Sequence, residues 1–167
     1  MKKKTILAAV IVFVLVLAGV YFGYPYYQVY RMNRHIDVNG IKLFTPIKKV
    51  FEIMGGEGEY IYGFGGFAHE YESENVRFYF SSDPDGKAYN KVSSIETGNP
   101  GHAVLGIHPG DSLARAVTVL EQAGFRKEES FYCKGDFYIR LTADYTTETV
   151  KEIQIGYIDR LLSDRVY

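Results

Sequence analysis

Cysteine and proline are scarce in this sequence of 167 residues, which contains one cysteine, Cys133, and five prolines. A single cysteine excludes an internal disulfide framework and a zinc cluster built from cysteines. The low proline content, together with 47% apolar and 23% charged residues, excludes disordered, collagen-like and mucin-like chains. A chain of this length is expected to carry one globular unit and a segment that leads into it.

Basic residues are also scarce outside the N-terminus. Residues 1–35 contain five basic and no acidic residues, which leaves 14 basic and 20 acidic residues for the rest of the chain. Nucleic-acid binding depends on clustered Lys and Arg, because these side chains neutralise phosphates. The acidic main domain therefore argues against a nucleic-acid partner.

The motifs of common catalytic and metal sites are missing as well. The sequence has no G-x-S-x-G, H-E-x-x-H or S-x-x-K pattern, which weakens hydrolase hypotheses. The four histidines are scattered without the spacing of metal ligands: His35, His69, His102 and His108. His69 is expected to be a solvated strand residue. Cys133 is expected to be a sequestered thiol; the alternative is a reactive thiol whose pKa is lowered by the neighbouring Lys134. We therefore predict no catalytic residue, no metal and no cofactor.

Two further patterns are better explained as turns than as ligand sites. Segment 83–87 contains D-x-D-G but lacks the ligand alternation and the distal Glu of a calcium-binding EF-hand loop. The glycine-rich stretches 55–58 and 63–66 lack the Lys-Ser/Thr ending of a phosphate-binding loop. Stretch 63–66 is instead expected to be the turn of a hairpin.

One long hydrophobic run is present, at 5–22, and it contains no charged residue. As a helix it would span about 27 Å, close to the thickness of a bilayer's hydrocarbon core. Three lysines precede it and several tyrosines follow it, which is typical of a span whose N-terminus is cytoplasmic. We predict a cytoplasmic tail at 1–4, a transmembrane signal anchor at 5–22 and a juxtamembrane linker at 23–37. The protein would then be a single-pass protein of the cell membrane with an extracytoplasmic C-terminal domain.

A cleaved secretory signal is the alternative for this run. Val16-Leu17-Ala18 resembles a cleavage site, and a basic segment before an apolar one is common to signals and anchors. The run is longer than the usual apolar core of a signal peptide, and the aromatic cluster beyond it favours the anchor. Both alternatives export the rest of the chain.

The exported part resembles itself at an offset of 66 residues. An apolar stripe at i, i+3, i+4 and i+7 in 47–54 recurs in 113–120, and this spacing is typical of a helix with one face against a core. Thr45 and Asp111 are N-cap residue types, and Gly55 and Gly124 are expected to end the two helices. Chance similarity between amphipathic elements is the alternative to a true repeat.

Strand patterns also recur after each helix. Segments 76–80 and 137–141 alternate apolar with Arg or Tyr, as half-buried strands do. A V-x-x-I pattern follows at 92–95 and at 150–153. The sequence therefore predicts an α+β fold: two repeat units, 38–100 and 101–167, each with one helix and antiparallel strands. The helices are expected to pack on one face of the sheet and to leave the other face to solvent or a partner.

The segment GIHPGDSLARAVTVL, with the closing V-x-x-I, carries a resemblance to a known family type. Over about residues 38–158 the chain resembles the tandem repeats of beta-lactamase inhibitor protein and of small lipoproteins of outer-membrane assembly. The paired cysteines of the inhibitor and the lipoprotein cysteine are missing here. The resemblance implies a protein-binding module rather than an enzyme.

The polar faces of the two predicted strands supply the candidate binding residues. Arg77 and Tyr79 alternate with the apolar residues of the first strand, and Tyr138 and Arg140 with those of the second. Alternation places all four on the exposed face, where they should be accessible together. Tyr and Arg concentrate binding energy at interfaces. The alternative is that sheets simply favour Tyr and that Arg stacks over it.

We therefore expect a membrane-anchored binding module of the cell envelope whose partner is a protein or peptide. The rivals are an envelope enzyme with a site assembled from scattered residues and a sugar- or ligand-sensing domain. A pocket with clustered carboxylates or a Cys–His pair would favour the enzyme, whereas a flat Tyr/Arg face would favour the binder. The loop at 63–67 and the linker around His102 and His108 are the remaining candidate sites.

Overall fold

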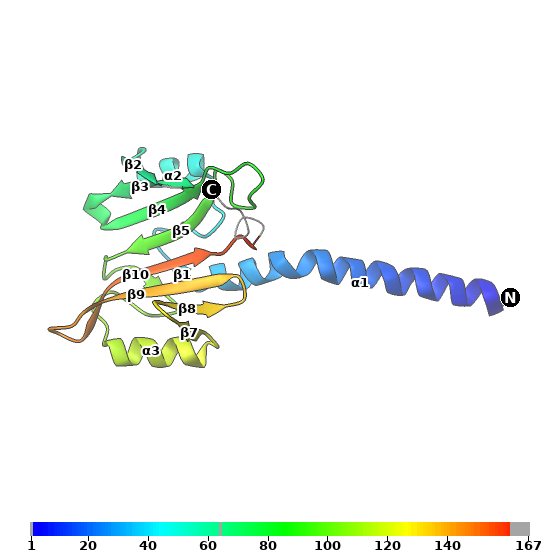
Figure 1. Ribbon diagram of the computed structural model, residues 1–167. Helices are drawn as coiled ribbons and strands as arrows, with labels where there is room; N and C mark the ends of the chain where they lie inside the picture. The colour runs from blue at the N-terminus through cyan, green and yellow to red at the C-terminus, as the bar shows by residue number, and fades with distance from the viewer. Residues whose placement is uncertain (1, 64, 161–167) are drawn as a thin grey trace. The chain divides into compact units, whose positions relative to one another are not determined.

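The computed structural model describes residues 2–63 and 65–160. The chain divides into two compact units, Met1–Arg34 and His35–Tyr167. The first unit contains one helix, α1 (Lys2–Asn33), and the second contains the remaining helices and all the described strands (Figure 1). Each unit is described by itself.

The predicted transmembrane anchor at 5–22 is wrong. Over the described part of the chain, no helix combines the length and the apolar character that crossing a membrane requires. The apolar run occupies only part of α1, which begins among lysines and continues through Gln28 and Arg31 to Asn33. Three further predictions depended on this anchor and are wrong with it: the single-pass topology, the location in the cell membrane and the membrane as a partner.

The second unit is built mainly from one antiparallel sheet. Its eight strands have the order β2-β3-β4-β5-β10-β9-β8-β7. Their bounds in chain order are β2 (Glu59–Gly63), β3 (Gly66–Tyr71), β4 (Val76–Ser81), β5 (Val92–Thr97), β7 (Arg126–Glu128), β8 (Phe131–Lys134), β9 (Phe137–Asp144) and β10 (Thr149–Tyr157). A separate pair joins β1 (Ile36–Asp37) to β6 (Ala103–Val104).

The helices of this unit are short. They are α2 (Ile47–Met54), α3 (Leu113–Gln122) and a 3-10 turn, η1 (Glu72–Glu74). Eight and ten residues of α-helix stand against an eight-stranded sheet, so the unit is mostly sheet. The predicted fold class, an α+β repeat behind a transmembrane helix, is therefore wrong as a whole.

Both halves of the unit nevertheless have the same order of elements. In the first half α2 precedes β2 to β5, and in the second half α3 precedes β7 to β10. The last strands of the two halves, β5 and β10, pair with each other at the centre of the sheet. The sheet is therefore continuous across both halves, with β2 at one edge and β7 at the other. The predicted unit boundary at residue 100 stays a prediction, because the structure forms one compact unit across it.

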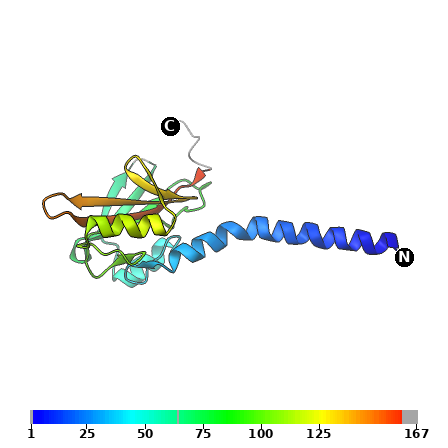
Figure 2. The same ribbon diagram turned by 90° about the horizontal axis from the view of Figure 1, so that it is seen from below.

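The apolar stripes of both helices face the core, as their spacing predicts. Val50 of α2 and Ala116 and Leu120 of α3 are fully buried. The Phe51 ring of α2 meets the His69 ring of β3 edge-on, with 4.7 Å between ring centroids. In Figure 2, α2 and α3 lie on the same side of the sheet. The buried strand residues share one face by alternation along the paired strands. Those residues come from four adjacent strands: Val76, Phe78, Phe80, Ile95, Phe137, Ile139, Ile153 and Ile155.

The helix ends differ in detail from the prediction. The residues at the N-caps are Pro46 and Ser112, and neither makes a side-chain capping hydrogen bond. The predicted cap Asp111 instead accepts a hydrogen bond from the backbone N–H of His108 at 2.9 Å. Gly55 does end α2 with a left-handed backbone (φ 77°), a conformation that costs glycine little.

Candidate binding surface

The four predicted binding residues lie on one face of the sheet, on strands that flank its centre. Arg77 and Tyr79 belong to β4, and Tyr138 and Arg140 belong to β9. Between them run β5 and β10, so the residues of the two halves face each other across two strands. All four side chains are half-buried, so each keeps part of its surface exposed on this face, and their role in binding stays a prediction.

The strand register arranges this face in two rows. One row crosses the sheet from Arg77 to Arg140 through Glu96 and Gln154. The adjacent row crosses from Tyr79 to Tyr138 through Ser94 and Gly156. The sheet therefore carries Arg opposite Arg and Tyr opposite Tyr about its centre. We call these eight residues the outer-face patch.

Glu96 of β5 joins the two halves of the outer-face patch. Its carboxylate accepts hydrogen bonds from Arg140 Nη2 at 2.9 Å, and from Arg77 Nη1 and the Tyr79 hydroxyl at 3.4 Å each. The Glu96 side chain is only 14% exposed. A carboxylate this buried needs cationic partners, and here one arginine comes from each half.

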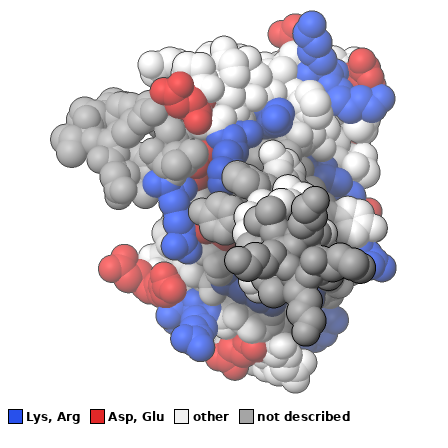
Figure 3. All heavy atoms as spheres, turned by 90° about the vertical axis from the view of Figure 1, so that its right-hand side faces the viewer, with Lys and Arg blue, Asp and Glu red and all other residues white. Residues whose placement is uncertain are grey.

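A second carboxylate holds Arg77 from the other side. Glu70 of β3 accepts a hydrogen bond from Arg77 Nη2 at 2.6 Å, while Arg77 Nη1 also donates to the Tyr79 hydroxyl at 3.2 Å. The Tyr79 hydrogen bond and the Glu70 carboxylate raise the pKa of Arg77, against the opposing effect of burial. Two arginines and two glutamates balance in charge. In the view of Figure 3, acidic and basic side chains are likewise interspersed.

Tyr138 is held against the strand next to it. A Cβ atom on Gly156 of β10 would overlap the Tyr138 ring, so the glycine makes room for the tyrosine. Next to Gly156 in the same row, Ser94 accepts a hydrogen bond from Gln154 Nε2 at 3.0 Å. Burial raises the pKa of Tyr138, so its hydroxyl stays protonated at neutral pH.

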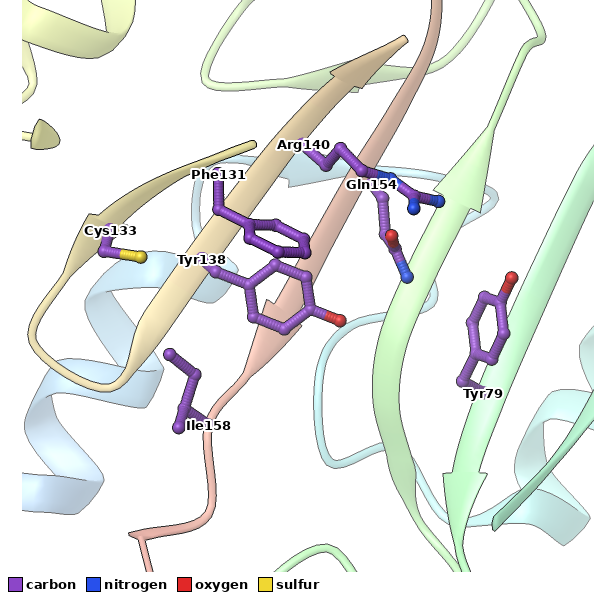
Figure 4. Close-up of a pocket in the computed structure, with 7 residues that line it drawn as sticks. All are labelled: Tyr79, Phe131, Cys133, Tyr138, Arg140, Gln154 and Ile158. Atoms are coloured by element: carbon purple, nitrogen blue, oxygen red, sulfur yellow. The ribbon is translucent and has the colours of Figure 1, made fainter. Parts of the chain in front are cut away.

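A pocket of about 500 Å³ opens beside these rows (Figure 4). Its lining residues are Tyr79, Phe131, Cys133, Tyr138, Arg140, Gln154 and Ile158. The Phe131 and Tyr138 rings meet edge-on with 5.3 Å between centroids, and Figure 4 shows them across the pocket from Tyr79. Arg140 is the charged member of this lining, which includes no His, Asp or Glu among the described residues.

Cys133 is not set up as a nucleophile. Burial and the nearby Glu128 carboxylate raise the pKa of its thiol, which keeps it protonated at neutral pH. Lys134 points its ammonium group to the backbone oxygen of Ala123 rather than to the sulfur.

The histidines do not converge on a common ligand site; two of them are buried, one among aromatic rings and one between loops. His69, expected to be solvated, is buried, because its ring lies among the aromatic rings of Phe51, Tyr60, Phe67 and Phe80. His102 is also buried, and its ring nitrogens lie 2.7 Å from Thr97 Oγ1 and 3.2 Å from Asn39 Oδ1. His108 is exposed. No group of three metal-ligating side chains occurs among the described residues.

The two remaining turn predictions lie outside the outer-face patch. Gly63 pairs with Gly66 at the end of the β2–β3 hairpin, whose residue 64 lies outside the described part of the chain. In segment 83–87, the Asp83 carboxylate accepts a hydrogen bond from the Asp85 N–H at 3.0 Å. This contact is typical of an Asx turn.

Sequence reasoning missed Glu70, Glu96, Gln154 and the pocket residue Phe131. Alternation alone places Glu96 and Gln154 on the outer face, because Ile95 and Ile153 beside them are apolar. Their closeness to the arginines depends on which strands pair, and no local pattern reports that pairing.

Comparison with known proteins gives a likeness of fold. No protein-family model matches the chain, and no curated protein is significantly similar to it in sequence. An extracellular protein containing a SCP domain from Bacillus anthracis str. Ames is similar in structure, with a TM-score of 0.53 and 11% identity over 75% of this chain and 47% of that one. The cysteine-rich secretory protein SAV1118 from Staphylococcus aureus has a TM-score of 0.51 and 14% identity, over 73% of this chain and 46% of that one.

The chain spans about half the length of these two proteins. Neither is a beta-lactamase inhibitor protein or an outer-membrane assembly lipoprotein, so the resemblance inferred from the sequence stays a prediction. At identities this low the likeness concerns the fold alone. About three quarters of the chain thus shares its fold with part of two proteins described as extracellular or secretory.

Proposed function

We propose that the outer-face patch binds a protein or peptide, with the adjacent pocket receiving one of the partner's side chains. The observation that carries this proposal is the convergence of Tyr79 and Arg140 on Glu96 beside the pocket, from strands that belong to opposite halves of the chain. Tyr and Arg are the residue types that contribute most at protein interfaces.

The ion-pair network supports this function because it fixes the side chains before a partner arrives. Arg77 and Arg140 are both held by Glu96, and Tyr138 lies against Gly156. Ordering a long side chain on binding costs about 0.5–1.5 kcal/mol, and side chains that are already ordered avoid most of this cost.

A small-molecule site is a weaker explanation of the pocket. Its volume of about 500 Å³ lies within the usual range for such sites. However, specific small-molecule binding needs polar groups that converge on the ligand, and here Arg140 donates to Glu96 and Gln154 donates to Ser94. An aromatic pocket beside a neutral polar network suits an apolar side chain with polar surroundings.

An enzyme is also less well supported. The pocket lining includes no carboxylate and no histidine among the described residues, so no general base faces into the pocket there. The raised pKa of the Cys133 thiol works against a thiolate nucleophile.

The test is comparative affinity capture from an extract of the source cells, with the full chain as bait. We expect Tyr79→Ala combined with Arg140→Ala to lose partners that the unchanged chain retains. Tyr145→Ala is the matched control, because Tyr145 is 86% exposed in the β9–β10 turn and outside the patch. The proposal is overturned if the double variant keeps every partner, or if Tyr145→Ala loses the same ones.

A further inference from the structure

The two edges of the eight-stranded sheet differ in how they are protected. Edge strands that avoid pairing with other chains are short, charged or covered. Strand β7 has both of the first two features, because it consists of Arg126, Lys127 and Glu128, all exposed. Strand β2 is longer, at five residues, and its one charged residue, Glu59, is at its end, while its central residues are Tyr60, Ile61 and Tyr62.

Strand β2 exposes two aromatic side chains and is held in place by its pairing with β3. Tyr60 is 56% exposed and Tyr62 is 83% exposed. Strand β2 pairs with β3 along its whole length, from Glu59 with Glu70 to Gly63 with Gly66. The backbone groups on the outer edge of β2 are paired to no other strand among the described residues, while its inner edge is held in regular register by β3.

The sequence of β2 complements itself in antiparallel orientation. If two copies of β2 pair with Ile61 opposite Ile61, then Tyr60 of each copy lies opposite Tyr62 of the other, and Glu59 lies opposite Gly63. Aromatic pairs directly opposite each other stabilise a sheet, whereas like charges there destabilise it. In this register Glu59, the only charged residue of the strand, does not lie opposite Glu59 of the other copy.

We infer that the chain forms a two-fold dimer through antiparallel pairing of β2 with β2 of a second copy. A two-fold axis through Ile61 satisfies the closed symmetry that most homo-oligomers adopt. The pairing joins two sheets into one, so both outer-face patches lie on the same side of it. Ile61 lies on that side, because it pairs with Ala68, which pairs with Tyr79. The dimer would present two patches to a repeated or two-fold partner.

Cysteine cross-linking tests this register directly. In the full chain with Cys133→Ser, we expect Ile61→Cys to form a disulfide-linked dimer under mild oxidation, because residues directly opposite have Cβ atoms about 4.5–5.5 Å apart. Glu59→Cys is the matched control, on the same strand and the same face. In this register the two copies of residue 59 are offset by four positions, or about 13 Å, and should not cross-link.

A second pair of variants tests the same register with cysteines placed away from the two-fold axis at Ile61. Chains with Tyr60→Cys and chains with Tyr62→Cys should cross-link when mixed, and much less when either is oxidised alone. Adding Ile61→Lys to both should abolish the cross-link, because two lysines would then lie opposite each other.

Association through any other part of the chain would not select residue 61. The inference is overturned if Glu59→Cys or Arg126→Cys cross-links as efficiently as Ile61→Cys. It is also overturned if Ile61→Cys chains that melt like the Cys133→Ser parent form no dimer. A peptide from another protein bound at β2 would give this second result.

Discussion

At Gly156 the lack of a side chain is what lets the Tyr138 ring lie against the backbone of β10. This close approach fixes the position of a pocket wall, since Tyr138 lines the pocket together with Phe131. A residue that looks unimportant in the sequence therefore shapes the candidate site.

Gly156→Ala should destabilise the protein by about 1–3 kcal/mol, the usual cost of overpacking, because the new methyl group overlaps the tyrosine ring. Denaturant unfolding measures the change. Gly56→Ala is the control, since a Cβ there meets nothing within 4 Å. Combining Gly156→Ala with Tyr138→Ala should remove most of the penalty of the glycine change, and a full penalty in that background would contradict the proposed contact.

Glu96 is the residue that connects the two halves of the outer-face patch electrostatically. We expect Glu96→Ala to lower the free energy of unfolding by about 1–2 kcal/mol, because it leaves Arg140 without its carboxylate partner. Glu52→Ala, which breaks the exposed pair with Lys49, should cost less than about 0.5 kcal/mol. Equal effects of the two changes in thermal melts would show that the Glu96 network is no stronger than a surface pair.

Among the elements, the loop that follows β5 is joined to the segment between β1 and α2 by a buried histidine. His102 connects Thr97, at the end of β5, to Asn39 in the segment before α2. Burial lowers the pKa of His102, although the Glu74 and Asp37 carboxylates act in the opposite direction. The folded protein therefore favours the neutral imidazole.

This lowered pKa gives a signed pH dependence. Below about pH 6.5 the unfolded chain binds a proton at His102 that the folded chain resists, so stability should fall as pH drops through that value and should be unaffected above it. Unfolding curves at pH 5 to 8 would measure it. His102→Gln should flatten the dependence in this window, whereas His108→Gln, at an exposed histidine, should leave it unchanged. A rise in stability on acidification would contradict the assignment.

The helices α2 and α3 stabilise the sheet through narrow apolar stripes. Val50→Asp and Ala116→Asp should each cost several kcal/mol, because both positions are fully buried and an unpaired charge there is strongly unfavourable. Ile53→Asp is the control on α2, where the side chain is 40% exposed. A Val50→Asp protein that melts like the Ile53→Asp protein would show that the stripe of α2 does not face the core.

Local periodicity explains which elements could be predicted from the sequence. Each stripe at 47–54 and 113–120 specifies a helix face, and alternation at 76–80 and 137–141 specifies a strand face, because both patterns depend only on neighbouring residues. His69 was expected to be solvated, but it is buried, and its burial depends on Phe51, which reaches it from α2, a contact that strand alternation does not report. The pairing of β5 with β10, and hence the contact of Glu96 with Arg140, is set by long-range packing.

At the scale of the whole molecule, the fold class and the location were predicted incorrectly. The apolar run at 5–22 has the length of a membrane span by itself, yet no described helix meets the criteria for one. The α+β prediction gave too much weight to two short helices and too little to the sheet, which extends across both halves without interruption. The shared order of elements places Arg77 with Tyr79 and Tyr138 with Arg140 at corresponding places about the sheet's centre.

The central claim is that the outer-face patch is where a partner protein binds, and site-specific photo-cross-linking tests it most directly. A photoreactive phenylalanine would replace Tyr79 in the full chain, and in separate samples Tyr145 or Tyr62, both exposed and outside the patch. Irradiation in an extract of the source cells should give discrete protein adducts from position 79 that are absent from positions 145 and 62. No adduct from position 79, or the same adducts from all three positions, would contradict the claim.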